Sequence, residues 1–169
     1  MLLELNDVSK SFGGVAALTG ISFGVKQGEV FGVIGPNGAG KTTLFNLITG
    51  VFPVSSGEIV FDGMSVVGIK PHRTVEMGIA RTFQNIRLFG NMTALETVLS
   101  ETEALRQLIG KIRDLGITVV VIEHAMELMM NICDRLVVFN FGKKIAEGTP
   151  QEIQNNEAVI EAYLGKEEV

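Results

Sequence analysis

The sequence predicts an α/β fold with a mostly parallel sheet flanked by helices, plus an antiparallel β part near the N-terminus. Segments of strand length alternate with segments of helical period along most of the chain. The segment at 30–34 is apolar on both faces, which is typical of a buried parallel strand. A glycine-rich turn leads from it directly into a helical pattern, so this strand and helix form the centre of the expected fold.

Length and composition indicate one domain. The chain has 169 residues, of which 46% are hydrophobic, enough to bury a core. We expect residues 1–34 and 55–66 to form the mainly antiparallel part, and residues 35–54 and 67–169 the α/β core and a C-terminal extension. The single Cys133 excludes an intrachain disulfide framework and fits a reducing compartment; we expect it to be a small buried hydrophobe.

Charge and hydropathy argue against two further classes of protein, general nucleic-acid binders and proteins that span a membrane. A net charge of −5 argues against a nucleic-acid binder that depends on general positive charge. Mean hydropathy is high at +0.34. Even so, no run approaches the ~18 consecutive apolar residues that span a bilayer. The start of the chain lacks the basic and apolar regions of a secretory signal, so we expect neither a membrane span nor a signal.

The first half of the chain alternates strands with short helices. Strands are expected in LLELNDV, in ISFGVKQGEVFGVIG with a turn at Gln27-Gly28, and in EIVFD closed by the Asp62-Gly63 turn. A helix begins at Lys41 and ends near Gly50. A second helix at 72–77 precedes a strand at 79–83.

Two helix-start patterns lie unusually close together in the second half, at 93–96 and 100–103. They indicate either one continuous helix or two helix starts joined in sequence. An apolar helical stripe then runs to Gly116. After it we expect a strand at 118–122, a helix from Ala125, a strand at 136–139, a turn at 140–142 and a strand at 144–148. Thr149-Pro150-Gln151-Glu152 forms a third capping box.

The glycine-rich turn matches the phosphate-loop pattern G-x-x-x-x-G-K-[ST] at every fixed position, between a strand and a helix as the pattern requires. Its residues, with the threonine that follows, are Gly35, Pro36, Asn37, Gly38, Ala39, Gly40, Lys41, Thr42 and Thr43. Backbone N–H groups of such a loop converge on anionic oxygens at the start of a helix. Lys41 would neutralise β- and γ-phosphate charge, Thr42 would bind Mg²⁺, and Thr43 could contact the α-phosphate.

Four segments in this order, SKSFGG, GPNGAGKTT, RTFQN and a strand ending at His124, resemble the ATP-binding subunits of ABC transporters, which have the P-loop NTPase fold. The segments GIARTFQNIRLFGNMTALE and GKKIAEGTPQEIQNNEAVIEAYLG resemble the branch that imports branched-chain amino acids. The resemblance implies ATP and Mg²⁺ as ligands. It also implies membrane subunits and a second ATP-binding subunit as partners, at the cytoplasmic face of the cell membrane.

The resemblance also implies roles for three residues outside the loop. Phe12 would stack on adenine, although on its own it fits a core residue as well. Gln84 would contact Mg²⁺ or the attacking water and sense the membrane partner, and His124 would contact the γ-phosphate. Without the resemblance, Gln84 is an exposed loop amide and His124 a hydrogen-bonded structural residue.

Two family motifs are missing, which indicates an internal deletion. The sequence lacks the acidic pair that ends an apolar strand (Walker B) and the Leu-Ser-Gly-Gly-Gln-type signature. The segment that ends at Ser100 is followed at once by one, beginning at Glu101, that resembles a part of the family lying beyond both motifs. Of three possible substitutes, Asp62, Glu123 and Asp134, none is convincing. A general base is typically worth ~10²–10⁴-fold. We therefore expect an ATP-binding subunit with severely impaired hydrolysis. The alternatives are a non-hydrolysing or interfering module and a non-functional remnant, so the status of the chain as an ATPase stays open.

The deletion and one substitution predict two structural changes. In the family the acidic strand lies between the strands at 118–122 and 79–83, so here these two either pair directly or leave an exposed edge. Ala125 stands where the importer pattern has Asp, and its helix should lack a side-chain N-cap worth ~1 kcal/mol.

Overall fold

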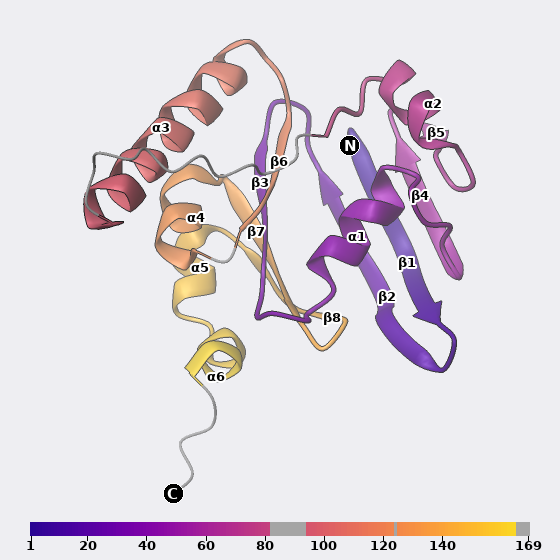
Figure 1. Cartoon of the computed structure of the whole chain (residues 1–169). Coiled ribbons are helices and arrows are strands. Elements are labelled where there is room, and N and C mark those ends of the chain that lie inside the picture. Colours follow the sequence, from indigo (N-terminus) through magenta and orange to yellow (C-terminus); the bar gives the residue numbers. More distant parts are fainter. Residues whose placement is uncertain (82–93, 124, 165–169) are drawn as a thin grey trace, which may run out of the picture.

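The computed structural model describes residues 1–81, 94–123 and 125–164 (Figure 1). The strands of this part are β1 Leu3–Phe12, β2 Val15–Val25, β3 Val30–Ile34, β4 Ser56–Phe61, β5 Met64–Ser65, β6 Val119–Ile122, β7 Arg135–Asn140 and β8 Lys143–Gly148. The helices are α1 Lys41–Ile48, α2 Pro71–Glu76, α3 Ala94–Asp114, α4 Met126–Ile132, α5 Pro150–Gln154 and α6 Glu157–Leu164.

The strands form two sheets. One is antiparallel with the order β2-β1-β4-β5, and the other has the order β6-β3-β7-β8. In the second sheet β3 pairs in parallel with both β6 and β7, and only β8 is antiparallel. This arrangement confirms the predicted α/β fold with its antiparallel β part. Within the range 1–34, β1 and β2 lie in the antiparallel sheet and β3 lies in the parallel sheet, as its apolar sequence indicates.

Both faces of β3 are buried, as its apolar sequence predicts. Phe31 and Val33 belong to a core cluster shared with β1, β2, β4, β7 and α1. Val30 and Ile34 belong to a second cluster formed with α3, α4, α5, α6 and β7. Successive side chains of a strand point to opposite faces, so one short strand contributes to both cores.

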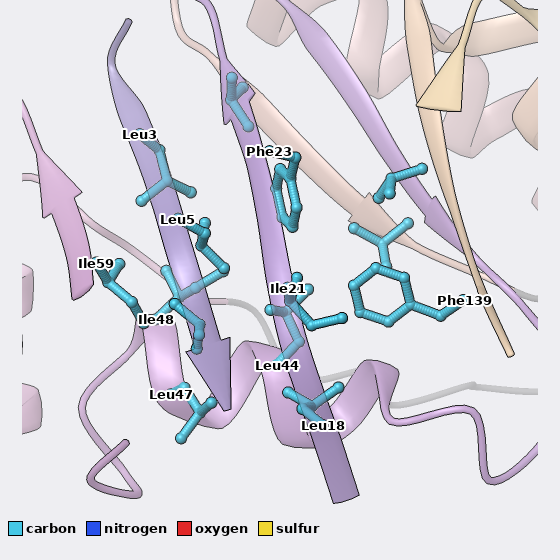
Figure 2. Close-up of a cluster of buried hydrophobic side chains, with 14 of the residues drawn as sticks. Leu3, Leu5, Leu18, Ile21, Phe23, Leu44, Leu47, Ile48, Ile59 and Phe139 are labelled. Atoms are coloured by element: carbon cyan, nitrogen blue, oxygen red, sulfur yellow. The ribbon is translucent and has the colours of Figure 1, made fainter. Parts of the chain in front are cut away.

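The first cluster holds α1 against the antiparallel sheet. Figure 2 shows Leu44, Leu47 and Ile48 of α1 among side chains of β1, β2 and β4. These three residues share one helix face, and each is at most 5% exposed. The second cluster lies on the other face of the parallel sheet, where Figure 1 shows α3, α4 and α5. The start of α1, at the end of β3, is therefore held between the two sheets.

Most local predictions are confirmed. The turns at Gln27-Gly28, Asp62-Gly63 and 140–142 are present. Residues 94–114 form one helix, so the pattern at 100–103 does not start a second one. The third capping box is complete: the Glu152 backbone N–H donates to Thr149 Oγ1, and the Glu152 carboxylate accepts the Thr149 backbone N–H at 2.7 Å. Ala125 is the N-cap of α4 and provides no side-chain hydrogen bond, as expected.

The pairing expected between 118–122 and 79–83 is not seen in the described part of the chain. There β6 pairs with β3 alone, and residues 79–81 belong to no strand. Residues 82 and 83 lie outside the described ranges. Ile79 instead packs against the first core cluster, and Arg81 donates to Asn46 Oδ1 of α1 at 2.6 Å.

Candidate functional site

The glycine-rich loop lies where the sequence predicts it, between β3 and α1. Gly38 and Gly40 have positive φ angles of 80° and 101°, a region that glycine adopts without strain. Gly40 is the N-cap of α1 and offers no side-chain hydrogen bond. The first backbone N–H groups of a helix have no intrahelical partner, so those of Lys41, Thr42 and Thr43 are open to an anion.

The Lys41 side chain is folded back over this loop. Its Nζ donates to the carbonyl oxygens of Gly35 at 2.6 Å and Pro36 at 2.9 Å. Burial lowers the pKa of the Lys41 ammonium, and the negative charge of Glu123 partly opposes this effect. The cation is therefore already placed among the loop atoms, where it can donate to phosphate oxygens in place of the neutral carbonyls.

A pocket of about 500 Å³ opens beside the loop. Its lining residues are Val15, Ala16, Ala17, Asn37, Gly38, Ala39, Gly40, Lys41, Thr42, Thr43, Phe141 and Gly142. Thus most of the predicted loop lines one cavity, together with the start of β2 and the β7–β8 turn. Sequence analysis missed the contribution of this turn, because a turn between two strands carries no binding motif.

Phe12 is not among the residues that line this pocket. Its ring packs edge-on against Phe52, with ring centroids 5.2 Å apart, and Lys10 Nζ lies 4.8 Å from the Phe12 centroid. Phe12 nevertheless remains 42% exposed. It therefore occupies an intermediate position between the two expected environments, core and ligand contact.

Gln84 and His124, the two predicted catalytic residues, lie outside the described residues. Glu123 comes directly after β6, whose last residue, Ile122, pairs with Val33 of β3. Because the two strands are parallel, Glu123 lies at the same end of the sheet as the start of the phosphate loop. Of the three acidic candidates it is the one that acts electrostatically on Lys41.

The other two acidic candidates have structural positions. The Asp134 carboxylate accepts the Val30 backbone N–H at 2.8 Å and so fixes the start of β3. Asp62 sits in the β4–β5 turn with a positive φ of 47°, within the antiparallel sheet. Neither lines the loop pocket. They cannot replace a carboxylate beside the terminal phosphate from these positions.

A second cavity, of about 610 Å³, separates the loop from α6. Pro36 and Asn37 line it on one side, and Ala158 and Ala162 on the other. Tyr163 of α6 packs against the second core cluster, and burial raises the pKa of its hydroxyl. The C-terminal helix thus forms part of the surroundings of the phosphate loop, which sequence motifs did not indicate.

The donor set around the loop suits a magnesium-bound nucleotide. Lys41, Thr42 and the backbone of residues 37–43 line the pocket, and a hydroxyl oxygen such as that of Thr42 is of the ligand type that Mg²⁺ prefers. Within the described ranges no group of three or more His, Cys, Asp or Glu side chains could hold a metal by itself.

Comparison with known proteins agrees with this geometry. The family model described as "ABC transporter" matches residues 18–157. The high-affinity branched-chain amino acid transport ATP-binding protein BraF of Pseudomonas aeruginosa is 30% identical, with 98% of each chain covered. LivG of Escherichia coli K12, which has the same description, is 28% identical with the same coverage.

The alignment to BraF also shows where the two chains differ in length. It extends over 250 positions, whereas this chain has 169 residues, so at least 81 positions have no counterpart here. Because 98% of each chain is covered, these positions fall inside the aligned region and not at its ends. An internal deletion of this size agrees with the loss of two motifs.

Solved structures show the same fold. The crystal structure of a nucleotide-free ATP-binding cassette from an ABC transporter superposes with a TM-score of 0.82 at 22% identity. The match covers 98% of this chain and 99% of that one. No helix in the described part of the chain is both long and apolar enough to cross a membrane. From its phosphate loop, its two-sheet fold and the family match over most of its length, the chain belongs to the ABC transporter ATP-binding family.

Proposed function

We propose that this chain is the ATP-binding subunit of an importer for branched-chain amino acids, and that it binds Mg·ATP but hydrolyses it at a severely reduced rate. The substrate class rests on the names of its relatives, which are branched-chain amino acid transport ATP-binding proteins. The proposed partners are membrane subunits and a second ATP-binding subunit, at the cytoplasmic face of the membrane.

The observation that carries nucleotide binding is the geometry of the loop. Lys41 Nζ lies 2.6 Å from the Gly35 carbonyl oxygen, and the uncapped start of α1 adds open N–H donors. Together they supply the positive charge and hydrogen bonds that a triphosphate requires. We assign the cradle to Gly35–Thr43, the metal contact to Thr42 and Gln84, and adenine stacking to Phe12. We assign the γ-phosphate contact to His124.

Loss of hydrolysis follows from what the chain does not contain. Phosphoryl transfer depends on positioning the attacking water and on spreading the developing charge. The acidic pair and the signature segment are both absent from the sequence. Glu123 is the single acidic candidate beside the loop, and its position one residue after β6 is already part of the importer pattern. We therefore do not assign it the role of general base.

Two measurements on purified protein test this proposal. Mg·ATP should raise the melting temperature, since a ligand at 100 times its Kd stabilises the folded state by about 2.7 kcal/mol. Steady-state phosphate release should stay near background. In the matched variant Lys41→Ala the thermal shift should disappear, while the unliganded melting transition remains cooperative.

The outcomes separate the alternatives. Phosphate release at the rate of an intact cassette, lost in Lys41→Ala, would overturn the impaired-hydrolysis part of the proposal. A thermal shift with release near background is expected both of the proposed subunit and of the non-hydrolysing module, and residual release that is lost in Lys41→Ala would favour the subunit. A chain that does not melt cooperatively would be the non-functional remnant.

A further inference from the structure

The β7–β8 turn presents an aromatic side chain to solvent in an unfavourable backbone conformation. Phe141 is 88% exposed, although it is one of the largest apolar residues of the chain. Its φ angle is +46°, in the left-handed region that residues with a Cβ rarely adopt. Neither packing nor backbone preference explains this residue, and such outliers cluster at ligand-binding sites.

The turn is fixed directly to the phosphate loop. The Gly142 backbone N–H donates to the Ala39 carbonyl oxygen at 3.1 Å, and the Thr19 N–H donates to the Gly142 carbonyl oxygen at 2.8 Å. Gly142 is buried, and Ala17 leaves no space beside it. Because Ala39 and Ala17, which fix Gly142, also line the pocket, the position of Phe141 relative to the loop is set before any ligand binds.

Phe141 and the loop line the same cavity. The pocket of about 500 Å³ is lined by the loop residues 37–43 together with Val15, Ala16 and Phe141. Its polar groups come from the loop, and its apolar surface comes from β2 and the turn. A ligand that fills it would place an anionic part on the loop and a flat apolar part against the aromatic ring.

We propose that the Phe141 ring packs against the nucleobase of the nucleotide whose phosphates occupy the loop, and so provides an aromatic contact besides Phe12. This inference rests on the proposed nucleotide binding. Every base has a π-face that stacks on an aromatic side chain with little regard for its identity. Phe141 should therefore increase affinity for nucleotides in general but not for a ligand without a base.

The test compares Mg·ATP with inorganic tripolyphosphate by calorimetric titration of the wild-type chain and its Phe141→Ala variant. Loss of one stacking contact should weaken ATP binding about tenfold. Binding of tripolyphosphate should remain unchanged. Equal ATP affinity in the two proteins would overturn the inference, as would an equal loss for both ligands. If the wild type itself binds neither ligand, the proposed function fails first and the inference fails with it.

Phe141→Gly separates binding from folding. Glycine suits a φ of +46°, so this variant should fold at least as well as Phe141→Ala while also lacking the ring. It should show the same selective loss of ATP affinity. Phe12→Ala is the matched aromatic control: if Phe12→Ala alone removes the difference between ATP and tripolyphosphate, Phe141 does not contact the base.

The composition of the chain offers a direct optical test. It contains no tryptophan, so Phe141→Trp introduces a single tryptophan at the turn, which can be excited selectively over Tyr163. Stacking should quench this fluorescence saturably with Mg·ATP and leave it unchanged with tripolyphosphate, at an affinity close to that of the wild type. An ATP titration that saturates the protein without changing its fluorescence would contradict the proposed contact.

Discussion

Alanine substitutions at Gly142 and Gly28 measure how much the contacts of the β7–β8 turn contribute to the free energy of unfolding. Their φ angles are nearly equal, 74° and 75°. A Cβ added to Gly28 meets nothing within 4 Å, whereas a Cβ added to Gly142 would lie 2.6 Å from the Ala17 carbonyl oxygen. Replacing each by alanine therefore imposes the same backbone penalty, and only Gly142→Ala adds a steric one.

The expected magnitudes follow from these contacts. A left-handed alanine costs about 1 kcal/mol, which is the full expected cost of Gly28→Ala. In Gly142→Ala the turn must also shift, which weakens its hydrogen bonds to Ala39 and Thr19, at 3.1 and 2.8 Å. Each is worth about 1 kcal/mol. We expect Gly142→Ala to lower the free energy of unfolding by about 3 kcal/mol in total.

Urea denaturation followed by far-ultraviolet circular dichroism measures the difference between the two variants. For a domain of this size, about 2 kcal/mol corresponds to roughly 4–8 °C in melting temperature. The reasoning is refuted if the two variants unfold within about 0.5 kcal/mol of each other, since the uncertainty of such measurements is of that order.

Three further predictions concern other parts of the fold. Ala125→Asp should supply the missing N-cap of α4 and raise the free energy of unfolding by about 1 kcal/mol in urea denaturation; an unchanged midpoint would contradict this. Arg135→Met should cost about 3 kcal/mol, because it leaves the Glu29 carboxylate, 6% exposed, without the guanidinium 3.0 Å away. Adding Glu29→Gln should recover part of that loss, and a fully additive double variant would argue against the pair. The Thr149 backbone N–H lowers the pKa of Glu152, so this carboxylate stabilises the fold above about pH 4.5 and ceases to do so as pH falls through its lower folded-state pKa. The stability difference between wild type and Glu152→Gln should therefore shrink in acid, and a constant difference from pH 6 to 2.5 would exclude the effect.

The sequence predicted those features whose cause is local. The phosphate loop is specified by its own glycines, Lys41 and the helix that follows. The turn at Asp62-Gly63 and the capping box at Thr149 depend on a few adjacent residues. The burial of Cys133 also followed from residue type alone.

Features that depend on distant segments were predicted less well. Family strand order left two outcomes open, direct pairing of β6 with residues 79–83 or an exposed edge; residues 79–81 join no strand, while Ile79 packs against the core and Arg81 contacts α1. The exposure of Phe141 was not foreseen either. It results from a turn held between Ala39 and Thr19, and no local pattern indicates that contact.

The burial of Cys133 has a practical consequence for studying subunit association. Cys133 is 7% exposed, and burial raises its pKa to about 12, so almost none of it is thiolate at neutral pH. Maleimide reagents should leave the folded wild type unlabelled. A cysteine introduced on an exposed strand end would then be the sole labelled position, and paired spin labels there would report distances between two copies without removal of the native thiol.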